Sequence, residues 1–404
     1  MLIEALFVFL LAGTMFSEGM LTVTLTWTIL DKGGSAVHLG IVLALMSLLP
    51  FFMQKFSTKI REQMTKNPLL IFAGVRCMGI LIIIVSLLNA KYLNVLSLYV
   101  FAGLFSIILF LSIQSLETYM SQMVLSGRFS SNKASNALQT SIQIGSFGGN
   151  ALAGFLMSLG GFNYVLYGLA LSLGIGVILP LVLPFLKSSN QEKTKESTTV
   201  HNDKQWNYNS SKILWVTIIG IAILAVQLST FNFLVPVLFH NVHHWDPMQY
   251  GFVSSAAGIG ALLAVLIGKF EKFIPKYIFI LIAVFDISIG LIDSWHLSIA
   301  AAFGLGFVFN RSRILQRTVL FEFIQTKQET VYWTSRSTLA FEFTKAASPL
   351  ILALLLQWLD TKYTGIILGV IGFTVSVSML IIYFYEIKYR TLNQQSKINV
   401  YNQM

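Results

Sequence analysis

The segment Lys187-Ser-Ser-Asn-Gln-Glu-Lys-Thr-Lys-Glu-Ser-Thr-Thr199 divides the sequence into two apolar halves. It is polar and mixed in charge, which is the composition of a flexible linker. Long apolar stretches separated by short polar loops lie on both sides of it, six before and six after. The sequence therefore predicts an all-α membrane protein with an N-terminal six-helix bundle at 1–186, a linker at 187–212 and a C-terminal six-helix bundle with a short tail at 213–404.

The composition argues against a soluble protein. Of the 404 residues, 55% are apolar and only 11% are charged, whereas soluble domains carry about 25% charged residues. A transmembrane helix needs about 20 apolar residues, and twelve stretches meet this requirement. The predicted spans are 3–28, 36–54, 69–88, 93–116, 135–158, 162–186, 213–239, 248–268, 275–293, 296–315, 331–357 and 363–387.

Basic residues gather on one side of the predicted topology. With a cytoplasmic N-terminus, most of the 27 lysines and arginines fall in inner loops, the linker and the C-terminal tail, and the outer loops hold only Lys32, Lys91 and Lys362. This asymmetry follows the positive-inside rule, so it explains the net charge of +10 without a nucleic-acid partner. The opening Met1-Leu-Ile-Glu4 lacks a basic region and predicts no cleaved signal peptide. The single cysteine, Cys77, excludes a disulfide framework.

Two six-helix halves joined by a basic cytoplasmic linker resemble the major facilitator superfamily of transporters. Four short stretches resemble, more narrowly, its macrolide-efflux and enterobactin-exporter branch. They are Trp27-Thr-Ile-Leu-Asp-Lys-Gly-Gly-Ser-Ala36 with Leu39-Gly40, Ser135-Asn-Ala-Leu138, Gly251-Phe-Val-Ser-Ser-Ala-Ala-Gly-Ile-Gly-Ala261 and Ser348-Pro-Leu350. The resemblance implies the two-bundle fold, a small-molecule substrate and export.

The sequence also departs from the superfamily's patterns. The loop between the second and third spans usually reads Gly-x-x-x-Asp-Arg-x-x-Arg-Arg, and here Glu62 takes the place of the acid while the glycine is missing. The resemblance implies that Glu62 latches one gating state, because a carboxylate is favoured near a helix N-terminus. The antiporter pattern Gly-Pro-x-x-x-Gly is replaced by Gly149-Asn-Ala-Leu-Ala-Gly154, which lacks the proline.

Glu18 is the first candidate for carrying protons. Thr14, Glu18, Thr22 and Thr26 recur every four residues and so drift by only about 40° per step around a helix. A carboxyl group removed from water gains a proton more easily, so Glu18 suits proton coupling. The alternative is a structural carboxylate that accepts hydrogen bonds from the neighbouring threonines.

Two further charges lie inside predicted spans of the first half. Arg76 lies about 11 Å into the third span at 1.5 Å per residue, and Glu117 ends the fourth span at a similar depth. We consider a buried ion pair between them, and alternatively a gating switch or a substrate clamp. Gln114, Gln139 and Gln143 could bind substrate or join helices to one another.

The second half carries a surplus of positive charge near its inner end. Asn310, Arg313 and Arg317 share one face of the tenth helix, with Arg311 beside them, and the eleventh span adds Arg336 and a Glu342–Lys345 pair. Asp286 and Glu322 could neutralise one arginine each, which leaves positive charge unmatched. Because arginine suits carboxylate binding, this pattern predicts a vestibule for anions; ordinary positive-inside charge is the alternative. The substrate-binding candidates are Arg76, Gln139, Gln143, Asn310, Arg311, Arg313 and Arg336.

The loop His240-Asn-Val-His243-His244-Trp-Asp246 has the spacing of metal ligands. It has no second partner region, so we interpret it as a wet outer loop and predict no metal site. Six tryptophans lie near span ends, as an aromatic belt would: Trp27, Trp215, Trp245, Trp295, Trp333 and Trp358.

Several motifs are missing from the sequence. It holds no Gly-x-x-x-x-Gly-Lys-[Ser/Thr], His-Glu-x-x-His or Gly-x-Ser-x-Gly stretch, which argues against an ATP motor and against the main competing class, a membrane-embedded enzyme. We predict instead a monomeric secondary exporter of the plasma membrane with cytoplasmic termini, coupled to protons and without a cofactor. The proton-coupling candidates are Glu18, Asp286 and Glu342, and the gating candidates are Glu62 and Glu117.

Two substrates fit the sequence. An anionic carboxylate siderophore agrees with the arginine surplus and with the enterobactin-exporter resemblance. A lipophilic, often cationic drug of the macrolide-efflux type agrees with Glu18 and the many phenylalanines. We rank the siderophore first.

Overall fold

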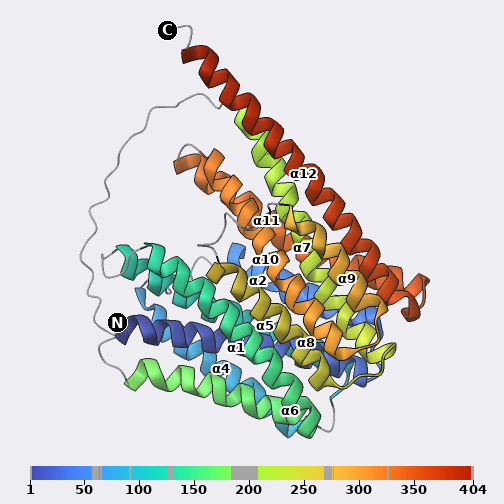
Figure 1. Ribbon diagram of the computed structural model, residues 1–404. Helices are drawn as coiled ribbons and strands as arrows, with labels where there is room; N and C mark the ends of the chain where they lie inside the picture. The colour runs from blue at the N-terminus through green and yellow to red at the C-terminus, as the bar shows by residue number, and fades with distance from the viewer. Residues whose placement is uncertain are drawn as a thin grey trace.

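The computed structural model describes residues 2–56, 63, 66–90, 93–125, 131–182, 208–267, 275, 277–324 and 327–401. The described chain is helical, with short turns between its helices (Figure 1). Most of the predicted linker lies outside these residues, as does Glu62.

The described part of the first half contains five long helices. They are α1 (Leu2–Asp31), α2 (Ala36–Phe56), α4 (Pro68–Leu88), α5 (Val95–Leu125) and α6 (Ser131–Val182). The last of these holds both the fifth and the sixth predicted spans. Gly160 and Gly161 break it into two arms, and Gly161 has φ of 67°, a conformation that glycine adopts without steric cost.

The second half follows the same order. Its elements are α7 (Tyr208–Asn241), α8 (Pro247–Leu266), the 3₁₀ turn η4 (Ile278–Ile280), α9 (Leu281–Leu291), α10 (Trp295–Phe323), α11 (Lys327–Trp358), the 3₁₀ turn η5 (Thr361–Tyr363) and α12 (Thr364–Tyr401). Proline at the first helical position begins both α4 and α8, where its missing N–H is harmless. Each of the twelve predicted spans thus falls on a helix.

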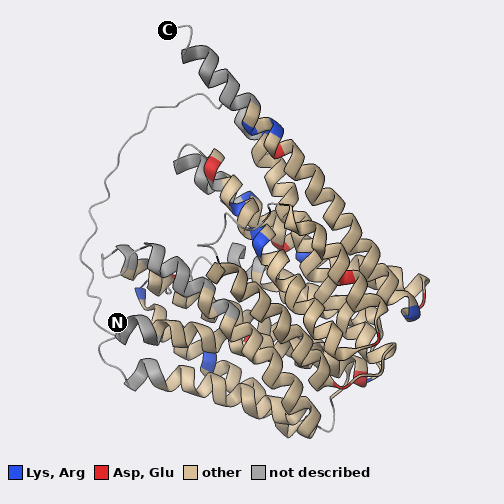
Figure 2. Ribbon diagram, in the orientation of Figure 1, with Lys and Arg blue, Asp and Glu red and all other residues tan. Residues whose placement is uncertain are grey.

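Length and apolarity agree with a membrane protein. Eight helices of the described chain are long and apolar enough to cross a bilayer, with the two arms of α6 counted together. Shorter apolar helices cover 36–50 and 278–291. Figure 2 shows that most of the described helical ribbon consists of residues other than Lys, Arg, Asp and Glu. Two tryptophans of the predicted belt, Trp27 and Trp333, are buried, so for these two the prediction is wrong.

The helices form two groups that meet at one end. In Figure 1 the α1–α6 group and the α7–α12 group diverge toward the side that carries both termini. At the other end α2 packs against α11, and α6 packs against α8. Gly154 of α6 and Gly251 of α8 face each other so closely that a Cβ on Gly154 would lie 2.9 Å from the Gly251 Cα.

Small residues also allow close packing inside the first half. A Cβ on Gly149 of α6 would overlap the Phe16 carbonyl oxygen of α1, and a Cβ on Gly19 would overlap the Ser146 carbonyl oxygen. Such small residues let helix backbones approach in membranes. This contact holds α1 in place, and α1 carries Glu18.

Candidate functional site

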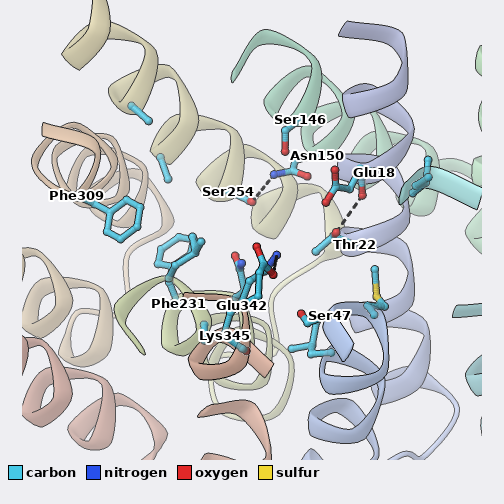
Figure 3. Close-up of a pocket in the computed structure, with 18 of the residues that line it drawn as sticks. Glu18, Thr22, Ser47, Ser146, Asn150, Phe231, Ser254, Phe309, Glu342 and Lys345 are labelled. Atoms are coloured by element: carbon cyan, nitrogen blue, oxygen red, sulfur yellow. Dashed lines mark hydrogen bonds and ion pairs between the residues drawn. The ribbon is translucent and has the colours of Figure 1, made fainter. Parts of the chain in front are cut away.

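A cavity of about 890 Å³ lies between the two groups of helices. Four helices of each half line it, namely α1, α2, α5 and the first arm of α6, then α7, α8, α10 and α11. No described residue of the remaining helices α4, α9 and α12 lines it. The two halves therefore share one central cavity, and Figure 3 shows part of its wall.

The charges on the cavity wall differ from the sequence prediction. Among the described residues, three carboxyl groups line it, those of Glu18, Glu117 and Glu342, against two basic groups, those of Arg313 and Lys345. If all five are ionised, these groups carry a slight negative charge. The described wall thus lacks the surplus of positive charge that the arginine count predicted for an anion vestibule.

Glu342 and Lys345 form the pair expected from their spacing. The Lys345 Nζ lies 3.8 Å from a Glu342 carboxylate oxygen. Both side chains interact electrostatically with Glu18 of α1 across the cavity (Figure 3). Acids from the first half and charges from the second half therefore face one another.

The threonines that share one face of α1 with Glu18 make their hydrogen bonds to the backbone of that helix. The hydroxyl groups of Thr14, Thr22 and Thr26 donate to backbone carbonyls one turn earlier, at 2.8, 3.0 and 2.9 Å. In the described chain, none of these threonines donates to the Glu18 carboxylate. The structural alternative, a carboxylate held by neighbouring threonines, is therefore wrong, and Glu18 points into the cavity.

Asn150 joins three helices at the cavity wall. In the amide orientation that satisfies both ends, the Asn150 oxygen accepts a hydrogen bond from Ser254 Oγ of α8 at 2.8 Å. The Asn150 nitrogen then donates to the Gly19 carbonyl of α1 at 2.9 Å. Asn150 occupies the place of the absent antiporter proline. The missing proline alone predicted no role for Asn150; the signal for that role is a lone amide inside an apolar span.

Apolar atoms make up the larger part of the wall surface. Phe231 of α7 and Phe309 of α10 face the same space in Figure 3. They are joined by Phe110, Phe147, Met46, Leu43, Leu109, Leu228 and Leu305. Polar side chains are about as numerous on the described wall as apolar residues, and such a mixed wall suits a small amphipathic molecule.

Arg76 does not pair with Glu117, so that prediction is wrong. Arg76 is buried among α1, α4 and α6, where Nη2 donates to the Thr14 hydroxyl and Nη1 donates to the Ser172 carbonyl at 3.1 Å. Glu117 instead lines the cavity, as does Gln114. Equal depth along two helices did not place the two side chains on facing surfaces.

The arginines of the second half are dispersed. Arg313 lines the cavity and its Cζ lies 5.0 Å from the centre of the Phe341 ring. Arg336 lies over the Trp215 ring, Arg311 is buried and Arg317 is exposed, and none of these three lines the cavity. Asn310 does line it, and its amide donates to the Ala261 carbonyl at 2.7 Å.

The acids proposed to neutralise those arginines have other partners. Asp286 accepts a hydrogen bond from Gln227 at 2.6 Å. Glu322 pairs with Arg390 of α12 at 2.7 Å. The suggested pairing of these acids with the arginines of α10 and α11 is therefore wrong.

The histidine loop closes one end of the molecule. His240 Nε2 lies 2.9 Å from Asp31 at the end of α1, which links the two halves. His243 contacts Asp293 at 3.0 Å, yet burial lowers the pKa of His243. Asp246 caps α8 in a capping box with Gln249. The described residues hold no group of three or more potential metal ligands.

Some predicted residues cannot be placed in the site. Glu62 lies outside the described residues, and the side chains of Gln139 and Gln143 lie outside the described part of α6.

The family model for the Major Facilitator Superfamily matches residues 120–331, just over half of the chain. Similar solved structures include the nucleoside transporter NupG, with TM-score 0.69 and 13% identity over 94% of this chain and 99% of that one. A bacterial homologue of the human lysosomal transporter Spinster, inward-facing and unoccupied, has TM-score 0.61 and 12% identity over 97% of each chain. A POT family transporter in complex with 5-aminolevulinic acid has TM-score 0.66 and 13% identity over 94% and 95%. At these identities the likeness concerns the fold alone, and no curated protein sequence matches the chain.

Proposed function

This chain belongs to the major facilitator superfamily, and from that premise we propose that it is a proton-coupled secondary exporter of a small amphipathic molecule. Membership makes it a multi-pass membrane transporter rather than an enzyme. The direction of transport, the protons, the plasma membrane and the cytoplasmic termini belong to the proposal. So do the division into bundles at 1–186 and 213–404 and the monomeric state.

The cavity wall supports a neutral or cationic substrate with a large apolar surface. Apolar atoms make up the larger part of the wall surface, and among the described residues three carboxyl groups face it against two basic groups. A cation gains from that excess of acids, and an aromatic wall also attracts cations. The composition of this wall carries the proposal, and it reverses the ranking from the sequence by favouring a drug-like molecule over an anionic siderophore.

Glu18 is the residue we propose for proton coupling. It lies on the wall between the two halves, and Lys345 and Glu342 of the opposite half act on it electrostatically. A movement of the halves would change the distance to these charges, and with it the affinity of Glu18 for a proton. Glu342 is held by Lys345, which makes it the weaker candidate.

The test uses purified protein in liposomes, with ethidium as the lipophilic cation and an imposed proton gradient. Glu18→Gln resembles the protonated state, so it should abolish uphill ethidium accumulation while downhill exchange continues. Glu322→Gln is the control, because it removes an acid that pairs with Arg390 away from the cavity wall, and it should leave both activities in place. Uphill transport by Glu18→Gln at the wild-type rate would rule out Glu18 as the coupling residue.

A carboxylate substrate is the second candidate, favoured by one observation: Arg313 and Lys345 both line the cavity. Citrate, a small tricarboxylate, should then compete with ethidium, and Arg313→Met should remove the competition. Secreted metabolites of a deletion strain and its parent, compared with scarce and with abundant iron, supply the cellular check. Unchanged secretion with heightened macrolide sensitivity would leave the drug as the substrate.

A further inference from the structure

Asp286 of α9 forms a buried pair with an amide. The Asp286 side chain has no exposed surface. Gln227 of α7 donates to it through Nε2, with the nitrogen 2.6 Å from Asp286 Oδ2. Asp286 itself does not line the central cavity. The pair belongs to the half of the molecule that does not contain Glu18.

The other two oxygens of this pair have no partner in the described chain. Asp286 Oδ1 and Gln227 Oε1 are both buried and make no hydrogen bond. An ionised carboxylate only accepts hydrogen bonds, so it cannot satisfy the Gln227 oxygen. A buried charge without a counter-charge also costs several kcal/mol.

The described residues of the helices around Asp286 supply no cation and no second donor. On α12, a Cβ at Gly372 would overlap the Asp286 carboxyl group, so the helix backbone lies directly against it. Ser376, one turn later, accepts from the Ala283 N–H at 3.0 Å and donates to the Phe279 carbonyl at 3.1 Å. In the described part of α7, α10 and α12, Gln227 is the polar side chain that acts on Asp286.

A proton on Asp286 resolves both problems. It removes the charge, and it turns one carboxyl oxygen into a donor. An acid and an amide then match, because each offers one donor and one acceptor. The same reasoning holds if the Gln227 amide is turned over, because its oxygen would then face Asp286 and require an O–H donor.

Gln227 connects this pair to transport, because its side chain also lines the central cavity. We propose that Asp286 and Gln227 form a second proton-binding site, in which a molecule in the cavity competes with Asp286 for the Gln227 amide. When Gln227 turns to that molecule, Asp286 loses the amide donor that would stabilise its ionised form, so Asp286 holds its proton more tightly while the cavity is occupied. This inference rests on the proposed transport function.

A second acid–amide pair provides an internal control. Gln316 of α10 donates to Glu386 of α12 at 3.1 Å, and Gln316 Oε1 has no partner among the described residues. Neither residue lines the central cavity. The two pairs therefore share their chemistry and differ in their contact with the cavity.

The experiment is infrared spectroscopy of the full chain in lipid, which detects the C=O stretch of protonated carboxyl groups. The wild type should show such bands near neutral pH, Asp286→Asn should lose one of them, and Gln227→Met should shift the frequency of that one because one hydrogen bond is lost. Ethidium should shift the same band in the wild type and in Glu386→Gln, in the direction that Gln227→Met does, and should cause no such shift in Asp286→Asn.

Two results would overturn the inference. If a folded Asp286→Asn protein, checked by thermal unfolding, loses no carboxyl band, Asp286 is ionised. If the band is present but neither Gln227→Met nor bound ethidium changes it, the proton is independent of the cavity. If ethidium does not bind at all, the proposed substrate class fails, while the Gln227→Met comparison still tests the pair.

Discussion

Arg76 and Asp286 occupy corresponding places in the two halves. Each lies on the third helix of its half, α4 or α9, and each has an ionisable side chain buried against the first and the last helix of that half. Arg76 contacts Thr14 and Ser172, and Asp286 contacts Gln227 and lies against the backbone of α12. A glycine, Gly176 or Gly372, leaves room for each side chain.

The two sites differ in whether their charge can change. A guanidinium group keeps its proton in proteins, and Arg76 lies over Phe72 with its Cζ 4.5 Å from the ring centre. Its charge is stabilised by oxygen acceptors and an aromatic face, without a carboxylate partner in the described chain. A carboxyl group can gain or lose a proton. The same position thus serves as a fixed cross-link in one half and as a switch in the other.

The largest expected effect comes from filling the space beside each group. Gly176→Ala would place its Cβ on the Arg76 guanidinium and should lower the free energy of unfolding by about 3 kcal/mol or more, since two hydrogen bonds to a charge are lost. Gly372→Ala should cost about 1–3 kcal/mol, because a neutral pair is disturbed. Unfolding in detergent measures both.

Gly174→Ala is the control for this pair, because a Cβ there meets nothing within 4 Å. It should be neutral or slightly stabilising, since alanine favours a helix by about 1 kcal/mol over glycine. Equal losses for Gly174→Ala and Gly176→Ala would show that the Arg76 contact does not matter.

The next comparison exchanges each group for a neutral amide. Arg76→Gln should cost about 2–3 kcal/mol, because it removes hydrogen bonds from a charged donor. Asp286→Asn should cost less than about 1 kcal/mol, because the Gln227 hydrogen bond survives and no charge is lost. Denaturant unfolding of both variants gives the two values. A large loss for Asp286→Asn would mean that the native group is ionised and would make the two sites alike.

The smallest effect is expected where the halves touch. Asp31→Asn weakens a half-exposed contact with His240, and such pairs contribute about 0.2–1 kcal/mol. Because this contact joins the halves, the variant should shift the distribution between closed and open outer ends without changing the unfolding of either half. Spin labels at Asn94 and Lys362 would report that distribution. An unchanged distribution would show that the other contacts between the halves, such as that of Gly154 with Gly251, suffice to keep the outer end closed.

The sequence predicted the helices well because apolar length is a property of each segment by itself. It also predicted the Glu342–Lys345 pair, because residues three apart on one helix must be neighbours. It failed for Arg76 and Glu117, since depth along two helices does not determine how each helix is rotated about its axis. For the same reason it counted Arg311 and Arg336 toward a cavity that they do not line. Gln227 carried no local signal, because its role depends on Asp286, 59 residues away.

Gly154 of α6 and Gly251 of α8 meet backbone to backbone, so the two helices can act as a hinge at a point where no side chain of either glycine separates them. From Gly154 to Ser131 at its free end, the first arm of α6 extends about 35 Å at 1.5 Å per residue. A rotation of about 10° at this contact would carry that end through about 6 Å while the two backbones barely slide. Because no side chain interlocks at the fulcrum, the lever can turn with little repacking there. The resistance to opening then comes from the polar contacts beside the fulcrum, chiefly those of Asn150 with Ser254 and of Asp31 with His240.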